Sequence, residues 1–157
     1  MHPLTFPQFN IVLFQPEIPA NTGNIGRLCV GTEAHLHIIK PCRFLLDDKS
    51  LRRAGLDYWQ DVYITLHDSL DAFLLQHPID RIWFCTTKTD RSYWNQRYAP
   101  QTCFVFGPES RGLPESLLDS YPDRCITIPM SAAIRSVNLA NSVAVILYEA
   151  IRQNLPR

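Results

Sequence analysis

Five short runs of apolar residues recur along the chain, and each has the length of a buried β-strand. They are Asn10–Gln15, Leu36–Ile39, Arg81–Cys85, Thr102–Phe106 and Cys125–Ile128. Runs that are apolar throughout are typical of strands covered on both faces. Helical patterns fall at about 24–34, 68–76, 114–119 and 138–154. This alternation predicts an α/β fold with a mostly parallel sheet and helices on both of its faces.

The length and charge of the chain limit what it can be. Its 157 residues fit a single domain, 1–157, that buries a core without the help of disulfides or a structural metal. Fifteen Lys and Arg residues balance fifteen Asp and Glu residues. This balance excludes nucleic-acid binding driven by bulk positive charge, but it leaves room for a local basic face.

The sequence predicts a cytoplasmic protein without a membrane segment. No run approaches the ~20 apolar residues of a membrane-spanning helix, and the first residues lack the pattern of a signal peptide. The five cysteines are odd in number and include no Cys-x-x-Cys pair. We therefore expect core side chains in a reducing compartment rather than disulfides or a zinc site.

The last predicted helix, Asn138–Asn154, is apolar on more than one face. One stripe at helical spacing comprises Ala140, Val143, Ala144, Leu147, Ala150 and Ile151. Val145 and Tyr148 lie on another side. The sheet would cover the first face, and either a neighbouring element or a second subunit would cover the other.

Three polar segments follow predicted strands, where open α/β sheets bind their ligands. The first, Asn21–Arg27 (NTGNIGR), is expected to form a loop that opens a helix, a place that favours anions. It lacks the G-x-G-x-x-G pattern of dinucleotide-binding folds. The alternative is a simple turn with a solvated Arg27.

The second segment, Phe106–Pro114 (FGPESRGLP), excludes two common enzyme classes. It lacks the Lys-Ser/Thr pair of an ATP-binding P-loop. Its Ser110 lies in a G-x-x-S-x-G pattern, one residue longer than the nucleophile elbow of serine hydrolases. Glu109 and Arg111 either hold a ligand here or form an ordinary surface pair.

The third segment, Ile128–Asn138 (IPMSAAIRSVN), runs into the apolar helix and is rich in serine and asparagine. Such residues suit recognition of a polar small molecule, although Ser136 alternatively serves as the helix N-cap. A metal site is not expected. His35 and His37 alternate along a predicted strand without further ligands at suitable spacing, while His67 and His77 fall in a polar helical region.

The three segments, in their order along the chain, resemble the three motifs of the SPOUT class of RNA methyltransferases, in its SpoU branch. The matching stretches are NTGNIGRLC, FGPESRGLP and IPMSAAIRSVNLANSVAVILYEA. The resemblance extends from Asn10 to about Gln153. The stretch Asp47–Tyr58 (DDKSLRRAGLDY) is similar to the small subgroup that methylates the wobble nucleotide of tRNA. The resemblance implies a C-terminal trefoil knot, a homodimer, and S-adenosylmethionine as the methyl donor, with no metal.

The resemblance also assigns roles to individual residues. The methyl donor would contact Cys85, Gly107, Ile128 and Ser136. Catalysis would rest on Arg27, Glu109, Ser136 and Asn138. Because a guanidinium is a poor base, we expect Arg27 to bind the adjacent phosphate and stabilise the developing alkoxide. Gly26 stands where the family often has a larger residue, and we expect it to loosen the first segment.

The implied substrate is the ribose 2′-hydroxyl of nucleotide 34, a cytidine or modified uridine, in leucine tRNAs. The expected RNA contacts are Arg27, Lys49, Arg52, Arg53, Lys88, Arg111 and Arg135. If helical, the segment with Lys49, Arg52 and Arg53 presents them on one face, although they also fit ordinary solvated charges. The alternatives are methylation of another tRNA or rRNA position, a non-catalytic module that binds RNA or S-adenosylmethionine, and an unrelated nucleotide-binding enzyme.

Overall fold

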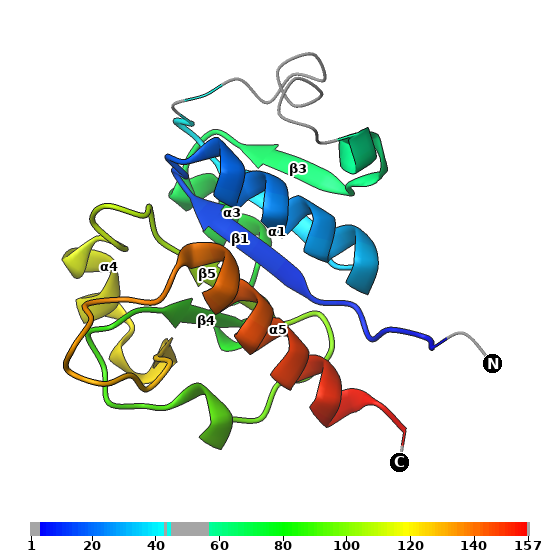
Figure 1. The fold of residues 1–157 in the computed structure, drawn as a ribbon. Helices are drawn as coiled ribbons and strands as arrows, with labels where there is room; N and C mark the ends of the chain where they lie inside the picture. Colours follow the sequence, from blue (N-terminus) through cyan, green and yellow to red (C-terminus); the bar gives the residue numbers. More distant parts are fainter. Residues whose placement is uncertain (1–3, 43, 45–56, 157) are drawn as a thin grey trace.

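The computed structural model describes residues 4–42, 44 and 57–156, and six of its strands form one sheet (Figure 1). The strands are β1 (Asn10–Phe14), β2 (His35–Ile39), β3 (Ile64–His67), β4 (Ile82–Cys85), β5 (Cys103–Phe106) and β6 (Cys125–Ile126). Their order is β3-β2-β1-β5-β4-β6, and every pairing is parallel. The prediction of an α/β fold built on a parallel sheet is confirmed.

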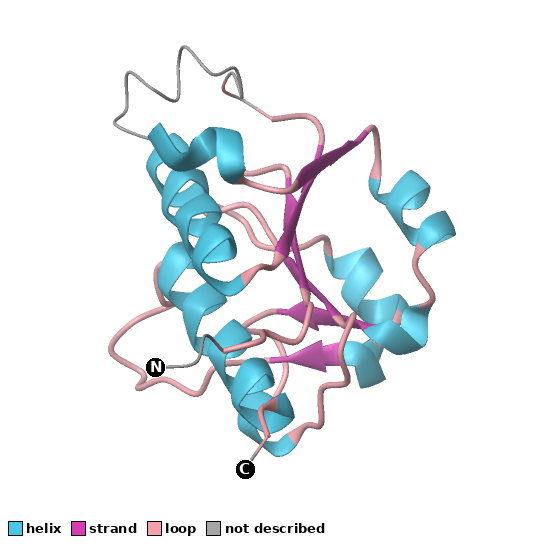
Figure 2. Ribbon diagram, turned by 90° about the vertical axis from the view of Figure 1, so that its right-hand side faces the viewer, coloured by secondary structure: helices cyan, strands magenta, loops and turns pink. Residues whose placement is uncertain are grey.

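Helices cover both faces of this sheet (Figure 2). The α-helices are α1 (Pro19–Thr32), α3 (Leu70–Gln76), α4 (Glu115–Ser120) and α5 (Leu139–Asn154). Short 3-10 turns are η1 (Asp57–Asp61), η2 (Ile79–Arg81), η3 (Tyr93–Asn95) and η4 (Pro122–Arg124). Helices α1 and α5 lie side by side on one face (Figure 1). No helix among the described residues is long and apolar enough to cross a membrane.

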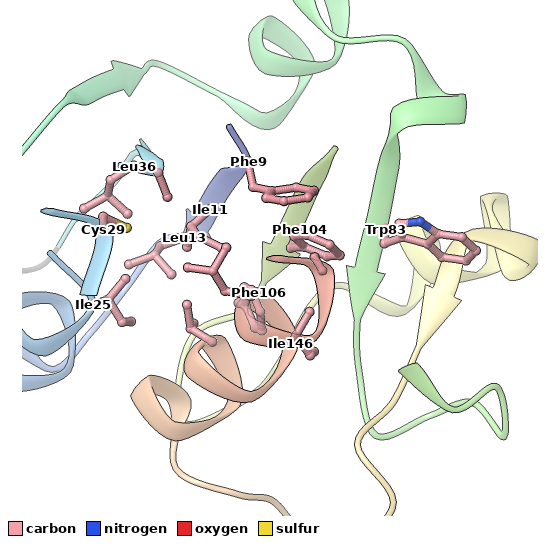
Figure 3. Close-up of a cluster of buried hydrophobic side chains, with 14 of the residues drawn as sticks. Phe9, Ile11, Leu13, Ile25, Cys29, Leu36, Trp83, Phe104, Phe106 and Ile146 are labelled. Carbon is pink, nitrogen blue, oxygen red and sulfur yellow. The ribbon is translucent and has the colours of Figure 1, made fainter. Parts of the chain in front are cut away.

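Alternate side chains of the strands point to opposite faces of the sheet, where they form two cores. Ile11 and Leu13 of β1 join the core beneath α1 and α5, where Figure 3 shows them near Ile25. The intervening Val12 and Phe14 join the second core, beneath α3 and α4. This period of two explains why the runs are apolar throughout. All five cysteines are free thiols, and three of them, Cys29, Cys103 and Cys125, are buried.

Strand β3 was not among the strands expected from the sequence. It is an edge strand with no second partner strand among the described residues, and its sequence ITLH mixes polar and apolar residues and lacks the apolar run of a central strand. His67 is its last residue and is buried, so the expectation that it lies in a helical region is wrong. His77 does lie at a helix end, as the C-cap of α3.

The first polar segment is helical, which corrects the expectation of a loop. Helix α1 begins at Pro19 rather than near Asn24, since a proline fits the first helical position. Its early residues are mostly buried, and Gly26 lies against Trp59. A Cβ on Gly26 would lie 2.5 Å from a carbon of that indole ring. Gly26 therefore permits tight packing, and the expectation that it loosens the segment is wrong.

Helix α5 begins one residue later than expected, and its cap is Asn138 rather than Ser136. The Asn138 side chain accepts a hydrogen bond from the Asn141 amide at 3.2 Å. The face beneath is buried against the sheet and α1. Val145 and Tyr148, on the other side, are 38% and 51% exposed. Within the described chain, the second apolar face of α5 thus remains uncovered.

Candidate active site

The three polar segments meet at one cavity of about 700 Å³. It opens at the carboxyl ends of β4, β5 and β6, which contribute Cys85, Phe106 and Ile126 to its wall. The remaining wall comes from the turn after β4, the loop after β5, the stretch from β6 into α5, and the start of α1. This is the edge of the sheet where the sequence predicts a ligand.

Most of the candidate residues lie at this cavity. Those in its wall are Cys85, Lys88, Gly107, Glu109, Arg111, Ile128, Arg135, Ser136 and Asn138. Arg27 is not in the wall of the cavity. Lys49, Arg52 and Arg53 lie outside the described residues. The tertiary structure thus brings together the residues expected to bind the methyl donor and three of those expected to bind RNA, Lys88, Arg111 and Arg135. The expected catalytic residue Arg27 lies apart from them.

Two carboxylates fix the loop after β5 against the start of α1. The Glu109 carboxylate accepts hydrogen bonds from the backbone amides of Glu17 at 2.7 Å and Ile18 at 3.3 Å. In return, Glu17 Oε1 accepts from the amide and the hydroxyl of Ser110, at 2.9 and 2.7 Å. A negative charge just before a helix is favourable because of the helix dipole. In the described chain, Glu109 therefore holds the cavity wall together, a role that its sequence position did not suggest.

The same loop depends on two glycines. A Cβ on Gly107 would lie 2.3 Å from the backbone nitrogen of Leu113, because the loop folds back on itself there. Gly112 has a φ of +70°, in the left-handed region that favours glycine, and its amide donates to Pro108 at 2.9 Å. The result is a compact turn whose residues lie in the cavity wall.

Asn138 connects the third segment to α1. Its side-chain nitrogen donates to Asn21 Oδ1 at 3.2 Å, while its own oxygen caps α5. Asn21 is buried and lies in the cavity wall. The sequence analysis did not single out Asn21 or Glu17, because neither stands out until the fold brings its partner close. The available signal was that Asn21 opens the first polar segment and that Glu17 lies shortly before it.

Cys85 is half-buried in the cavity wall. Burial raises the pKa of its thiol well above the usual value, and Cys125 raises it further. The thiol therefore stays protonated near neutral pH, so Cys85 is a poor nucleophile. It contributes shape and backbone atoms to the cavity.

Three basic side chains surround the cavity mouth. Lys88 pairs with the exposed Glu115 at 2.5 Å. Arg111 donates to the side-chain oxygen of Gln15. Arg135 is exposed and forms no ion pair with any described residue. Three basic residues thus line the cavity of a chain whose net charge is zero.

Arg27 lies on the exposed side of α1. It is six residues beyond Asn21, or about 9 Å along the helix axis at 1.5 Å per residue. Its guanidinium carbon lies 5.8 Å from the centre of the Tyr58 ring, and the Tyr58 hydroxyl donates to the Gly23 carbonyl at 2.6 Å. The arginine is therefore supported by η1 and separate from the cavity of its own chain.

The chain is similar to known proteins over nearly its whole length. The Escherichia coli K12 protein named tRNA (cytidine(34)-2'-O)-methyltransferase is 50% identical over 145 residues, which cover 92% of both chains. A solved structure from work on "the 2-OH methylation of C/U34 on tRNA" is 42% identical, has a TM-score of 0.84, and matches 93% of this chain and 95% of its own.

A more distant structure has the same fold. The SpoU methyltransferase AviRb from Streptomyces viridochromogenes, in complex with the cofactor AdoMet, is 23% identical with a TM-score of 0.77. The match covers 96% of this chain and 62% of AviRb. The model of the SpoU rRNA Methylase family matches residues 8–148, which include β1 to β6, every segment of the cavity wall and most of α5. This chain therefore belongs to the SpoU methylase family.

Proposed function

We propose that this protein transfers a methyl group from S-adenosylmethionine to the ribose 2′-hydroxyl of nucleotide 34 of tRNA, a cytidine or a uridine. The observation that carries the proposal is the 50% identity to a tRNA (cytidine(34)-2'-O)-methyltransferase, which extends over 92% of both chains. We treat residues 1–157 as one methyltransferase domain. We further expect leucine tRNAs to be its substrates and the cytoplasm, where tRNA is found, to be its location.

The cavity fits the methyl donor. Its volume of about 700 Å³ lies within the range of small-molecule sites. The folded-back turn at Gly107 offers backbone groups, Ile128 offers an apolar surface, and Ser136 offers a hydroxyl. These three residues and Cys85 would hold the donor. Its sulfonium supplies an electrophilic methyl group with a built-in leaving group, so the chemistry needs no metal.

The other residues would prepare the ribose. A ribose hydroxyl is a weak nucleophile, and the charge that develops on its oxygen must be stabilised. Arg27 would bind the adjacent phosphate and place its positive charge near that oxygen. Ser136 and Asn138, where α5 begins at the cavity wall, would orient the ribose. Glu109 would keep the loop after β5 closed over the donor.

A second copy of the chain would complete this arrangement. Arg27 lies outside the cavity wall of its own chain, and α1 lies beside α5, whose Val145 and Tyr148 are exposed. A second copy packed against these exposed side chains would lie next to Arg27. We propose that the protein is an obligate homodimer in which Arg27 of the partner subunit reaches the cavity.

The C-terminal segment would be threaded to form a trefoil knot. Between β6 and α5 the chain shares one cavity with the turn after β4 and with the loop after β5. It then returns to pack α5 against α1, more than a hundred residues earlier in the sequence. This path brings the C-terminal segment close to the loop through which it would pass.

Charge at the cavity mouth would hold the RNA. Lys88, Arg111 and Arg135 lie in the cavity wall, and Arg27 lies on the neighbouring helix. Lys49, Arg52 and Arg53 would add to this surface. In a dimer both sets would be present twice, which would offset the neutral net charge of the chain.

Methyl transfer to unmethylated tRNA tests the proposal. The protein is incubated with labelled S-adenosylmethionine and tRNA from cells that lack the modification, and the RNA is then hydrolysed in alkali. A 2′-O-methyl group blocks cleavage of the adjacent phosphodiester, so label in an alkali-resistant dinucleotide containing nucleotide 34 is expected. Label in mononucleotides would mean base methylation and would contradict the proposal. Donor binding without transfer to any RNA would favour a binding module.

A further inference from the structure

The 3-10 turn η1 lies against the part of α1 that carries Arg27. Two consecutive aromatic residues, Tyr58 and Trp59, make this contact. Trp59 is buried in the core, and its ring occupies the space that a side chain on Gly26 would need. Val62, just after η1, also lies near Gly26. The turn is therefore fixed on α1 by close packing, which gives the neighbouring Tyr58 a defined position.

Tyr58 contacts both the side chain of Arg27 and the helical turn that ends at this residue. Its ring lies beneath the guanidinium, with 5.8 Å between the guanidinium carbon and the ring centre, within the range of a cation–π interaction. Its hydroxyl donates to the Gly23 carbonyl at 2.6 Å. In an α-helix the carbonyl of residue 23 pairs with the amide of residue 27. The hydroxyl thus binds the helical turn that ends at Arg27, while the ring supports the end of its side chain.

This arrangement solves a problem that the proposed reaction poses. An exposed arginine has a long flexible side chain, and ordering it at the moment of RNA binding costs free energy. A ring that already favours one direction of the guanidinium reduces that cost. Among the described residues, no other aromatic ring lies over the Arg27 guanidinium.

We propose that Tyr58 is a positioning residue for methyl transfer, which holds Arg27 in the orientation that engages the RNA. The inference rests on the proposed function, since it requires Arg27 to contact the substrate. Tyr58 itself touches neither the donor nor the reacting atoms. It acts through the α1 turn and the guanidinium.

Two substitutions separate the contributions of the hydroxyl and the ring. Tyr58→Phe keeps the ring and removes the hydrogen bond to Gly23, and kcat should fall about threefold, as expected for one neutral hydrogen bond. Tyr58→Leu removes both contacts, and kcat/KM for tRNA should fall about 10- to 100-fold, in the range of a misplaced catalytic group. The affinity for S-adenosylmethionine should stay unchanged in both, because Tyr58 is not in the cavity wall.

Tyr63→Leu is the matched control. Tyr63 is also a tyrosine near η1, but it is 66% exposed and stacks on His35 of β2 instead of contacting α1. Its substitution should leave kcat and KM within about twofold of the parent, since surface changes of this kind have small effects. An equal loss in Tyr63→Leu and Tyr58→Leu would mean that the effect is a general one on this corner of the fold, and would overturn the inference.

A double-mutant cycle on tRNA affinity tests whether Tyr58 acts through Arg27. Tyr58→Leu should weaken tRNA binding in the parent protein and have no further effect in an Arg27→Ala background. Equal weakening in both backgrounds would overturn the inference. If Arg27→Ala itself retains turnover, the role of Arg27 in the proposed function fails, while the binding cycle still reports on Tyr58.

Folding of the variants is checked by thermal unfolding and by donor affinity. If Tyr58→Leu does not fold, Tyr58→Phe decides the question, because it retains the packing of the ring. A fall in its kcat at unchanged donor affinity supports the positioning role. A kcat equal to that of the parent contradicts it.

Discussion

His37 Nδ1 and His67 Nε2 share a buried hydrogen bond of 2.9 Å that joins β2 to β3. The other nitrogen of His37 lies 2.9 Å from Asn10 Oδ1, which is an acceptor. Neutral His37 therefore carries its proton on Nε2, so His67 must donate from its own Nε2 to His37 Nδ1. While both rings are neutral the chain of hydrogen bonds has one direction, and protonation of both rings would oppose two N–H groups and break the bond between them.

This arrangement predicts a loss of stability in mild acid. Burial, followed by repulsion from His35, His67 and His77, lowers the pKa of His37 to about 3. The pKa of His35 falls to about 4 for the same main reason, and those of His67 and His77 are also lowered by burial. The unfolded chain, with a histidine pKa near 6.5, takes up protons first. Stability should be complete above pH ~6.5 and fall as the pH drops toward 4.

Urea unfolding at a series of pH values between 7.5 and 5 measures this effect. His37 alone, which is 2% exposed, should cost up to about 1.4 kcal/mol for each pH unit below 6.5. The four histidines line a second cavity, and its other titratable residues, Arg81 and Cys103, supply no negative charge that would favour a protonated ring.

His67→Gln provides the matching variant. A glutamine amide can still donate to His37 but takes up no proton, so the decline in acid should become shallower. Asp68→Asn, at an exposed carboxylate beside β3, should leave the slope between pH 7 and 5.5 unchanged. Titration of His35 or His37 near pH 6.5 in the folded protein would contradict the prediction.

Substitution of Gly26 should destabilise the protein. The new Cβ of Gly26→Ala would lie 2.5 Å from the Trp59 ring, and overpacking of this kind costs about 1–3 kcal/mol. The better helix propensity of alanine returns up to about 1 kcal/mol. Chemical denaturation should therefore show a net loss of up to about 2 kcal/mol, the overpacking cost less that gain.

Gly31→Ala is the internal comparison for Gly26→Ala, because Gly31 lies in the same helix with no atom within 4 Å of its Cβ position. It should stabilise the protein by up to about 1 kcal/mol. If both substitutions stabilise the protein, the contact between α1 and Trp59 is looser than described.

The Glu109 carboxylate should matter for donor binding. Glu109→Gln retains one acceptor oxygen but loses the charge beside the start of α1, so the loop after β5 should be less firmly closed. Calorimetric titration with S-adenosylmethionine should show affinity reduced about 3- to 10-fold, in line with the loss of one charge-assisted contact. Asp119→Asn, which replaces an exposed acid on α4, should bind S-adenosylmethionine with the affinity of the parent protein. Normal binding by Glu109→Gln would show that the loop closes without its charge.

Arg27→Ala should abolish methyl transfer and preserve donor binding. Loss of a group that stabilises developing negative charge typically reduces kcat about 100-fold or more. The donor cavity does not include Arg27, so the affinity for S-adenosylmethionine should not change. Arg97→Ala, at another exposed arginine outside the cavity wall, is the control. Substantial turnover by Arg27→Ala would require a different group to stabilise the alkoxide.

Tyr148→Glu should dissociate the proposed dimer. Tyr148 is 51% exposed on the uncovered apolar face of α5, and a charge buried there in an interface would be costly. Sedimentation velocity should show a monomer. This monomer should not transfer methyl groups to tRNA. Leu75→Glu, at an 89% exposed leucine on α3, should leave the oligomeric state unchanged. A parent protein that sediments as a monomer would refute the dimer.

The central part of the fold was predictable from local sequence. Strands such as Ile11–Phe14 are buried on both faces, so their residues are apolar throughout and stand out against the helices. The three polar segments follow such strands, and the parallel arrangement brings the second and third, together with Asn21 of the first, to one cavity. Edge strand β3 was missed because one of its sides faces solvent, which removes that apolar signal.

Only the tertiary structure decided how the polar residues are used. Residues 21–27 look like a loop in isolation, because glycine and asparagine disfavour a helix. Their helix forms because Trp59 packs on Gly26, Asn138 binds Asn21, and Tyr58 binds Gly23. The partners of Glu109 lie 91 and 92 residues away in the sequence. Local propensity reports the neighbours of a residue along the chain, whereas such contacts arise from packing between distant segments, which no short pattern records.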